Sequence, residues 1–374
     1  LSKSNRITQG NSMKIAIIGS RGIPAQYGGF EVLAEKLALG LSERGHEVCV
    51  YCLDRLKEID FVAPGVKRIF VKTPSLSSLE KLWLSNYSVF HCLFKEKIDA
   101  IIFLGVSAGL FMWLPRIFSK RLIINLDGLE WKRSRWNFLG RILLKVLEKL
   151  AIKWADVRVA DSMEIGKYIQ EKYKKDFVYI PYGADPCHCN IETLKDPEGG
   201  YNLKPDDYYI AVGRNVPENN LDMIVEGFLL SNSSKKLVIV SNEQPRIPEN
   251  DRIIFTGPIY DRSKLFALRK NAFAHIHGHS VGGTNPSLLE AISCRNIVLA
   301  YDVPFNREVL GDYGFYFNNS RKLAYIINGL ENGSIVPEKE KTLEYYNKII
   351  KERYNWELVV SKYAEVLEMK GGDE

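Results

Sequence analysis

The sequence predicts an α/β protein with two doubly wound domains, and three observations carry this prediction. Short apolar strands alternate with helical patterns along most of the chain, which is typical of a parallel sheet covered on both faces. The alternation occurs twice, before and after a polar stretch that ends near residue 206. The length of 374 residues is too great for one ordinary core and suits two or three domains.

Continuous apolar runs predict the strands. They lie at 14–19, 47–52, 66–71, 99–104, 121–126, 156–161 and 176–181 in the first half, and at 208–213, 236–241, 252–257, 273–277, 296–301 and 314–317 in the second. Helical periodicity is clearest at 30–44, 138–154, 163–173, 218–230, 261–270, 286–294, 303–310, 320–330, 338–352 and 356–369. Because open α/β sheets bind ligands at the carboxyl ends of their strands, two such domains facing each other would hold a ligand in a central cleft.

We divide the chain into four segments. Residues 1–12 are polar and are expected to be a leader or an expression remnant, because they lack the apolar core of a secretory signal. The N-terminal domain is expected at 13–190 and the C-terminal domain at 191–352. The helix within 353–374 is expected to pack back on the N-terminal domain.

Charge and cysteine content exclude several classes of protein. The formal net charge is +6, too mild an excess for a nucleic-acid-binding tail. Residues 116–175 contain fifteen Lys/Arg against seven Asp/Glu, so one region carries the basic character. No apolar run approaches the roughly 20 residues that span a bilayer. Six cysteines do not make a disulfide framework, and a reducing cytoplasm is the expected location.

A glycine-containing loop follows the first predicted strand. Gly28 and Gly29 precede a helix whose first turn contains Glu31. Glycines there let a ligand approach the backbone closely, although they also suit a simple turn. The spacing differs from the dinucleotide fingerprint.

A second stretch that carries candidate ligand-binding residues is "VGRNVPENNLDMIVEGF" (212–228), in the second half of the chain. Arg214 directly follows a predicted strand, where its guanidinium would hold a diphosphate through two hydrogen bonds or form a surface ion pair. Pro217 suits the first turn of a helix whose buried stripe is Leu221, Ile224, Val225 and Phe228.

The third stretch, "HIHGHSVGGTNPSLLE" (275–290), allows two interpretations. His275, His277 and His279 alternate as metal ligands on a strand would. Gly282 and Gly283, followed by Asn285 as helix cap and Pro286 at the first helical position, instead form an anion or sugar cradle. The second interpretation places His279 beside a diphosphate and Glu290 within reach of ligand hydroxyls.

In this order the stretches resemble the retaining glycosyltransferases of the GT-B fold, family 4. The motifs that carry the resemblance are "GSRGIPAQYGGFE", "LDGLEWKRSRW", "ADS", "PYGAD", "GRNVPENN" and "GGTNPSLLEA", and it extends over nearly all of residues 13–370. Within the family the sequence is most similar to a bacterial subgroup that includes rhamnosyltransferases of polysaccharide assembly. The resemblance implies two Rossmann-like domains, the first on the acceptor side and the second binding the nucleotide sugar.

The resemblance also assigns residues to the donor site. Gly28 and Gly29 match the glycine loop, Arg214 matches the diphosphate-binding Arg, and Glu290 matches the ribose-binding Glu. Asn219, beside Asn220, stands where the family usually has Lys, and Gly282 replaces the first Glu of the usual pair. Backbone amides of Gly283, Thr284 and Asn285 would then orient the sugar, which is compatible with a deoxy sugar such as rhamnose.

Two carboxylates in the first domain are candidates for the catalytic base. Asp127 occupies the position of a frequent family His after the strand at 121–126, and Glu130 follows on the same loop. Either would accept the proton of an acceptor hydroxyl, while the alternative is that Asp127 caps a helix. The resemblance implies a metal-independent enzyme that uses no cofactor.

We therefore predict a retaining glycosyltransferase that uses a TDP-, UDP- or GDP-sugar and a saccharide or polyprenyl-diphosphate-linked acceptor. Basic residues spaced by four along 138–154 would let that helix lie on anionic lipid at the inner face of the plasma membrane. The alternative is a core helix whose basic face is solvated. The alternatives are a nucleotide-sugar 2-epimerase, a catalytically silent nucleotide-sugar-binding protein, and a zinc protein built on the histidine triplet.

Overall fold

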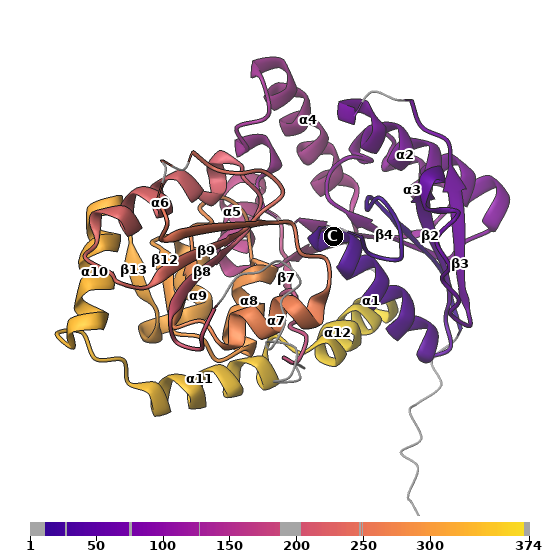
Figure 1. The fold of residues 1–374 in the computed structure, drawn as a ribbon. Coiled ribbons are helices and arrows are strands. Elements are labelled where there is room, and N and C mark those ends of the chain that lie inside the picture. The colour runs from indigo at the N-terminus through magenta and orange to yellow at the C-terminus, as the bar shows by residue number, and fades with distance from the viewer. Residues whose placement is uncertain are drawn as a thin grey trace, which may run out of the picture. The chain divides into compact units, whose positions relative to one another are not determined.

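The computed structural model describes residues 12–26, 28–74, 77–126, 128–187, 203–246, 248 and 250–369. Outside these residues lie, among others, residues 1–11, Asp127 and residues 188–202 of the polar stretch. The chain divides into two units (Figure 1). Unit 1 comprises the chain up to Lys132, Trp136–Pro181 and the chain from Trp356; unit 2 comprises Arg133–Arg135 and Tyr182–Asn355.

Unit 1 is built on a seven-stranded parallel sheet in the order β3-β2-β1-β4-β5-β6-β7. Its strands are β1 (Lys14–Ile18), β2 (Glu47–Leu53), β3 (Val66–Val71), β4 (Ala100–Leu104), β5 (Arg121–Leu126), β6 (Val157–Ala160) and β7 (Val178–Tyr179). The central strands are buried, because helices cover both faces of a parallel sheet. The order reverses between β1 and β4, which defines the switch point of the sheet.

The helical elements of unit 1 follow the strands. They are α1 (Gly29–Glu43), η1 (Asp54–Leu56), α2 (Ser77–His91), η2 (Cys92–Glu96), η3 (Gly109–Phe111), α3 (Trp113–Ile117), η4 (Glu130–Lys132), α4 (Phe138–Trp154), α5 (Met163–Tyr173) and α12 (Trp356–Glu368). Asn137 caps α4 by accepting a hydrogen bond from Gly140 N, and Ser162 caps α5 in the same way.

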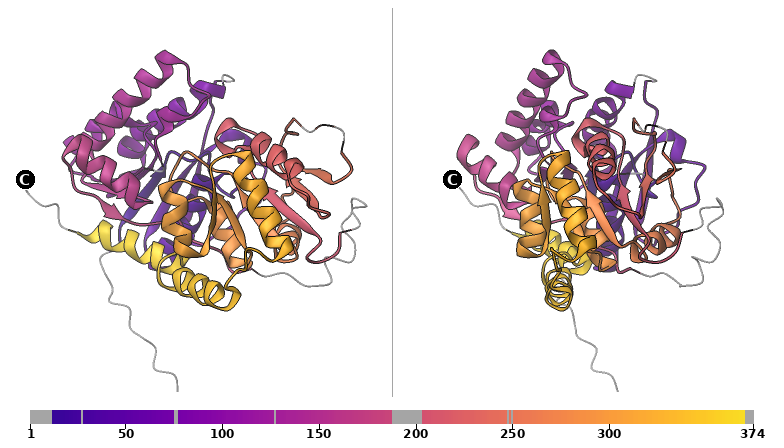
Figure 2. Two further views of the ribbon diagram at one scale, coloured as in Figure 1. Left: turned by 90° about the vertical axis from the view of Figure 1, so that its left-hand side faces the viewer. Right: turned by 60° about the vertical axis from the view of Figure 1, so that its left-hand side comes forward.

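The C-terminal helix α12 belongs to unit 1 and lies beside α1 (Figures 1 and 2). Gly40 of α1 permits this contact, because a Cβ there would lie 2.7 Å from Cγ1 of Val360. The Arg121 guanidinium donates to the Val366 carbonyl over 3.0 Å, and Asn125 Nδ2 donates to the Tyr363 hydroxyl over 2.6 Å. Helix α12 is thereby fixed to β5 as well as to α1.

Unit 2 repeats the architecture with a six-stranded parallel sheet in the order β10-β9-β8-β11-β12-β13. Its strands are β8 (Tyr208–Val212), β9 (Lys236–Val240), β10 (Ile253–Gly257), β11 (Ala274–His277), β12 (Val298–Tyr301) and β13 (Phe315–Phe317). Its helical elements are η6 (Pro217–Asn219), α6 (Leu221–Leu230), α7 (Arg262–Lys270), α8 (Pro286–Ser293), α9 (Pro304–Leu310), η7 (Gly311–Tyr313), α10 (Ser320–Asn332) and α11 (Lys339–Glu352). The switch point lies between β8 and β11.

The predicted fold class of two doubly wound α/β domains is confirmed. The predicted strands are all present, although β7 is only two residues long. The predicted helix at 218–230 is a short η6 followed by α6, whose predicted buried stripe is correct. Helix α2 was not among the helices set out from the sequence. No helix among the described residues is long and apolar enough to cross a membrane.

Candidate functional site

The candidate site of unit 2 lies at the carboxyl ends of β8 and β11, on either side of the switch point. Strand β8 ends at Val212 and leads into the loop 213–220, while β11 ends at His277 and leads into the loop 278–285. Since β8 and β11 are hydrogen-bonded neighbours, both loops leave the same edge of the sheet. This is the position at which doubly wound sheets bind ligands.

Direct hydrogen bonds join the two loops. Ser280 donates to the Glu218 carbonyl from its backbone N over 2.8 Å and from its hydroxyl over 2.9 Å. Asn220 Nδ2 donates to the Gly278 carbonyl over 2.7 Å. Gly278 is required there, because a Cβ would overlap the carbonyl oxygen of Asn219. The two loops therefore form one rigid edge.

Asn219, which replaces the usual family Lys, is part of this edge. Its Nδ2 donates to the Arg214 carbonyl over 2.8 Å, and its Oδ1 lies 2.9 Å from Nδ1 of His279. Burial, with the positive charges of Arg133 and Arg214, lowers the pKa of His279 to about 3. His279 is therefore neutral near pH 7, and because Asn219 Oδ1 can only accept a hydrogen bond, the ring takes the tautomer whose Nδ1 donates to it.

The N-terminus of α8 closes the site. Asn285 caps the helix by accepting from Ser287 N over 2.9 Å, and Pro286 occupies the first helical position, as predicted. Gly282 precedes the cap with φ +149°, and a Cβ at Gly282 would lie 2.8 Å from Nε2 of His279. A carboxylate side chain at position 282 would thus displace His279. Gly283 and Thr284, which join Gly282 to the cap residue Asn285, are both buried.

Glu290 is held by two arginines of α7 that the sequence analysis missed. Arg269, which is fully buried, donates to Oε2 of Glu290 over 2.9 Å, and Arg262 approaches Oε1 at 3.8 Å. Arg269 also donates to the Ser287 hydroxyl over 3.0 Å, which in turn donates to the Val212 carbonyl over 3.0 Å. The available signal was the spacing of Arg269, which follows the apolar Leu265 and Phe266 by four and three residues in the predicted helix at 261–270.

The predicted histidine row is buried in unit 2. His275 and His277 lie on one side of β11 with ring centroids 6.1 Å apart. Burial lowers the pKa of both well below the usual value, so both rings are neutral. Over the part of the chain that the structure describes, no three His, Cys, Asp or Glu side chains gather as metal ligands.

The remaining candidates belong to unit 1. Gly28 has φ +116° and precedes α1, which begins at Gly29. Glu130 lies in η4 and accepts a hydrogen bond from Nε1 of Trp136 over 2.9 Å. Asp127 is outside the described residues. The structure thus assigns Gly28, Gly29 and Glu130 to unit 1. It brings together in unit 2 the candidates Arg214, Asn219, Asn220, His279, Gly283, Thr284, Asn285 and Glu290.

The chain is similar to one family model of unknown function and to two glycosyltransferases. A family model described as a domain of unknown function, DUF1972, matches residues 12–185. Alpha-1,3/1,6-mannosyltransferase ALG2 of Candida glabrata is 27% identical over 254 residues, which cover 60% of this chain and 53% of that protein. The chain therefore spans about half the length of ALG2. An uncharacterized glycosyltransferase of Methanocaldococcus jannaschii, MJ1069, is 23% identical over 95% of this chain and 98% of its own length.

Solved structures share the whole architecture. Sucrose-phosphate synthase from Thermosynechococcus elongatus has a TM-score of 0.77 at 17% identity, covering 95% of this chain and 98% of that one. Anabaena HepE in complex with UDP-glucose has a TM-score of 0.71 at 16% identity, covering 95% and 99%. The chain shares the GT-B fold of these solved structures, with two doubly wound α/β units.

The buried histidines predict a pH-dependent stability. Their pKa values are lower in the folded than in the unfolded state, so below about pH 6.5 the unfolded chain binds more protons and stability falls as the pH falls. Each such histidine contributes a slope of up to about 1.4 kcal/mol per pH unit. Both ring nitrogens of His275 lack a hydrogen-bond partner among the described residues. His275→Leu should therefore keep or raise the free energy of unfolding at pH 7.5 and flatten its decline toward pH 5, measured by denaturant titration. An unchanged slope would contradict this account.

Proposed function

We propose that this protein is a retaining glycosyltransferase of bacterial surface-polysaccharide synthesis. It transfers a hexose or deoxyhexose, with rhamnose as the preferred candidate, from a nucleotide sugar to a lipid-linked or saccharide acceptor. The observation that carries the proposal is the rigid edge of unit 2, where Arg214 and the N-terminus of α8 follow adjacent strands at the switch point. Its transferase relatives favour transfer over 2-epimerisation and over silent binding.

This edge suits a nucleoside diphosphate. The N-terminus of a helix carries a partial positive charge from the helix dipole, which attracts anions, and a guanidinium can bind two phosphate oxygens at once. Arg214 and α8 would therefore stabilise the negative charge that develops on the leaving diphosphate. Neutral His279 can take part only through a hydrogen bond. A metal-independent reaction is proposed because the chain's own groups offer this positive potential. The neighbour HepE, crystallised with UDP-glucose, makes a UDP-sugar one reasonable donor to test.

Gly282 and His279 support a deoxy sugar. Because His279 occupies the space beside Gly282, the carboxylate that the family usually places there is replaced by a ring nitrogen and backbone amides. A deoxyhexose has one hydroxyl fewer than a hexose and needs one hydrogen-bonding partner fewer. Glu290, oriented by Arg269, is proposed to accept hydrogen bonds from the ribose.

The acceptor is proposed to bind unit 1, with Glu130 or Asp127 as its base. The indole of Trp136 donates to Oε1 of Glu130 and so orients the carboxylate that is proposed to accept the proton. Helix α4 supports a membrane-bound acceptor. The side chains of Phe138, Leu139, Ile142, Leu143 and Val146 are between 45% and 75% exposed, although a soluble core helix would bury such residues. Arg141, Lys145 and Lys149 accompany them on an amphipathic helix of the kind that lies on anionic lipid. We accordingly propose a cytoplasmic protein on the inner face of the plasma membrane.

Removing the guanidinium tests the donor site. Arg214→Ala should lower donor affinity and turnover by roughly 10- to 100-fold, since a charged hydrogen bond contributes about 1.5–3 kcal/mol. The measurement is a screen of TDP-, UDP- and GDP-sugars by thermal shift and by turnover. Arg295→Ala is the matched control, because Arg295 is exposed and lies between α8 and the start of β12, at the opposite edge of the sheet. A loss of only a few-fold would refute the phosphate assignment. Conversion of the donor to an isomer without any acceptor would identify a 2-epimerase instead.

Replacing the proposed base separates catalysis from folding. Glu130→Gln keeps an oxygen that can accept from Trp136 but cannot take a proton, so kcat should fall by about 10²- to 10⁴-fold. The thermal midpoint and the KM for the donor should stay near their wild-type values. If kcat is retained, Glu130 is not the base, and Asp127→Asn becomes the deciding variant.

Flotation with liposomes tests the membrane surface. The protein should float with vesicles containing anionic lipid and not with neutral ones, and added salt should weaken binding. Val146→Glu should reduce the bound fraction about tenfold, because it removes one apolar contact and adds repulsion. Tyr325→Glu, at a similarly exposed position of unit 2, should have no effect. Flotation without preference for anionic lipid would remove the membrane proposal.

A further inference from the structure

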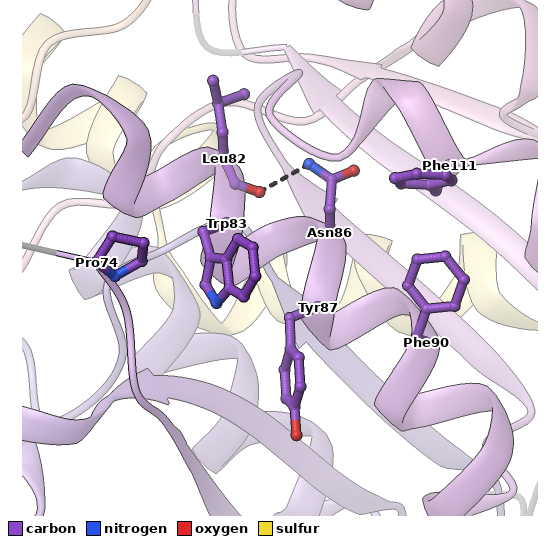
Figure 3. Close-up of a pocket in the computed structure, with 7 residues that line it drawn as sticks. All are labelled: Pro74, Leu82, Trp83, Asn86, Tyr87, Phe90 and Phe111. Atoms are coloured by element: carbon purple, nitrogen blue, oxygen red, sulfur yellow. Dashed lines mark hydrogen bonds between the residues drawn. The ribbon is translucent and has the colours of Figure 1, made fainter. Parts of the chain in front are cut away.

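Helix α2 forms one wall of an apolar cavity in unit 1. The cavity has a volume of about 420 Å³ and is lined by Pro74, Leu82, Trp83, Asn86, Tyr87, Phe90 and Phe111 (Figure 3). Five of these residues recur at helical spacing along α2, and Phe111 comes from η3. Figure 3 shows the rings of Trp83 and Tyr87 between Pro74 on one side and Phe90 and Phe111 on the other.

The cavity offers almost no polar group to a ligand. No charged side chain lines it. The Nδ2 group of Asn86 is engaged, because it donates to the Leu82 carbonyl over 2.7 Å and to the Ser107 carbonyl over 3.1 Å. Its Oδ1 is buried and has no hydrogen-bond partner among the described residues, but one acceptor cannot replace the several hydrogen bonds that a sugar makes. A sugar or nucleotide placed there would lose its hydrogen bonds to water without replacement. The ligand that fits is a hydrocarbon.

The aromatic lining is incompletely covered. Trp83 is 52% exposed, Tyr87 45% and Phe90 39%. Aromatic side chains gain from being buried, and a concave apolar group of them marks a binding site more often than a solvated surface. The volume lies within the range of roughly 300–1,000 Å³ that is typical of small-molecule pockets.

We propose that this cavity binds the isoprenoid chain of a polyprenyl-phosphate-type acceptor. The flat, branched isoprene units can pack against the faces of the four aromatic rings, which a straight saturated chain does less well. The charge of the surroundings complements an anionic head group: η3, which supplies Phe111, packs on α4, and the segment 116–175 that contains α4 is strongly basic. The inference rests on the proposed lipid-linked acceptor and adds the site that would hold its chain.

Calorimetry on the full chain tests the cavity directly. Farnesyl phosphate should bind, while dodecyl phosphate, with a saturated chain, should bind about tenfold more weakly and inorganic phosphate not measurably. Tyr87→Glu should weaken farnesyl phosphate binding about tenfold or more, and Tyr87→Phe should restore it. Phe94→Glu is the matched control, because Phe94 is 59% exposed on the neighbouring η2 but does not line the cavity. Its affinity should stay within about twofold of wild type.

Four outcomes would overturn the proposal. They are no binding of farnesyl phosphate, equal binding of dodecyl phosphate, equal weakening by Tyr87→Glu and Phe94→Glu, and binding that is lost in Arg214→Ala but kept in Tyr87→Glu. The last would mean that the phosphate occupies unit 2. An unfolded Tyr87→Glu protein, detected by circular dichroism, is replaced by Trp83→Ala, with the same expectation.

Kinetics separate this inference from the proposed function. If both hold, Tyr87→Glu raises the KM for an isoprenoid-linked acceptor about tenfold and leaves the KM for the donor unchanged. Farnesyl phosphate binding without any transfer would refute only the transferase proposal. Transfer to an isoprenoid-linked acceptor that Tyr87→Glu leaves unchanged would refute only the cavity.

Discussion

The close approach of two backbones at Gly278 is the constraint on which the candidate donor site depends. Any side chain there would overlap the Asn219 carbonyl and push apart the loops that follow β8 and β11. With glycine, Glu218 and Asn220 can bond directly to the opposite loop. The loops then need no ligand to fix them, so the backbone that would receive a diphosphate is organised before binding, and less free energy is lost to ordering when a ligand arrives.

Burial determines which polar groups beneath this edge carry a charge. His275 and His277 are neutral because burial lowers their pKa values, whereas the buried guanidinium of Arg269 is paired with the carboxylate of Glu290. A buried cation without a partner would be costly. Arg269 is therefore already compensated by Glu290. The exchange of the usual Lys for Asn219 fits this arrangement, since Asn219 serves the loop backbone and His279.

Much of this could be predicted from the sequence because the signals are local. Apolar strands alternating with helices gave the two sheets, and Asn285-Pro286 marked the start of α8 correctly. The link from Arg269 to Glu290 was not predictable, because it joins residues on two helices, α7 and α8, and only the folded chain brings them together. The hydrogen-bond pairing of Asn219 with His279, 60 residues apart, escaped for the same reason.

Unit 1 shows where periodicity fails as a guide. A hydrophobic stripe tells how a helix is divided into two faces but not which face meets the core. In α4 the buried face includes Leu144, Leu147 and the polar Glu148, whose carboxylate accepts from Trp131 Nε1 over 3.1 Å, while residues of the apolar stripe such as Ile142 and Val146 are exposed. Helix α2 likewise presents aromatic rings outward. Helices α2 and α4 therefore both expose apolar side chains that a helix of a soluble protein would bury. This supports the proposal that both contact an apolar environment, which a membrane surface carrying an isoprenoid lipid would provide.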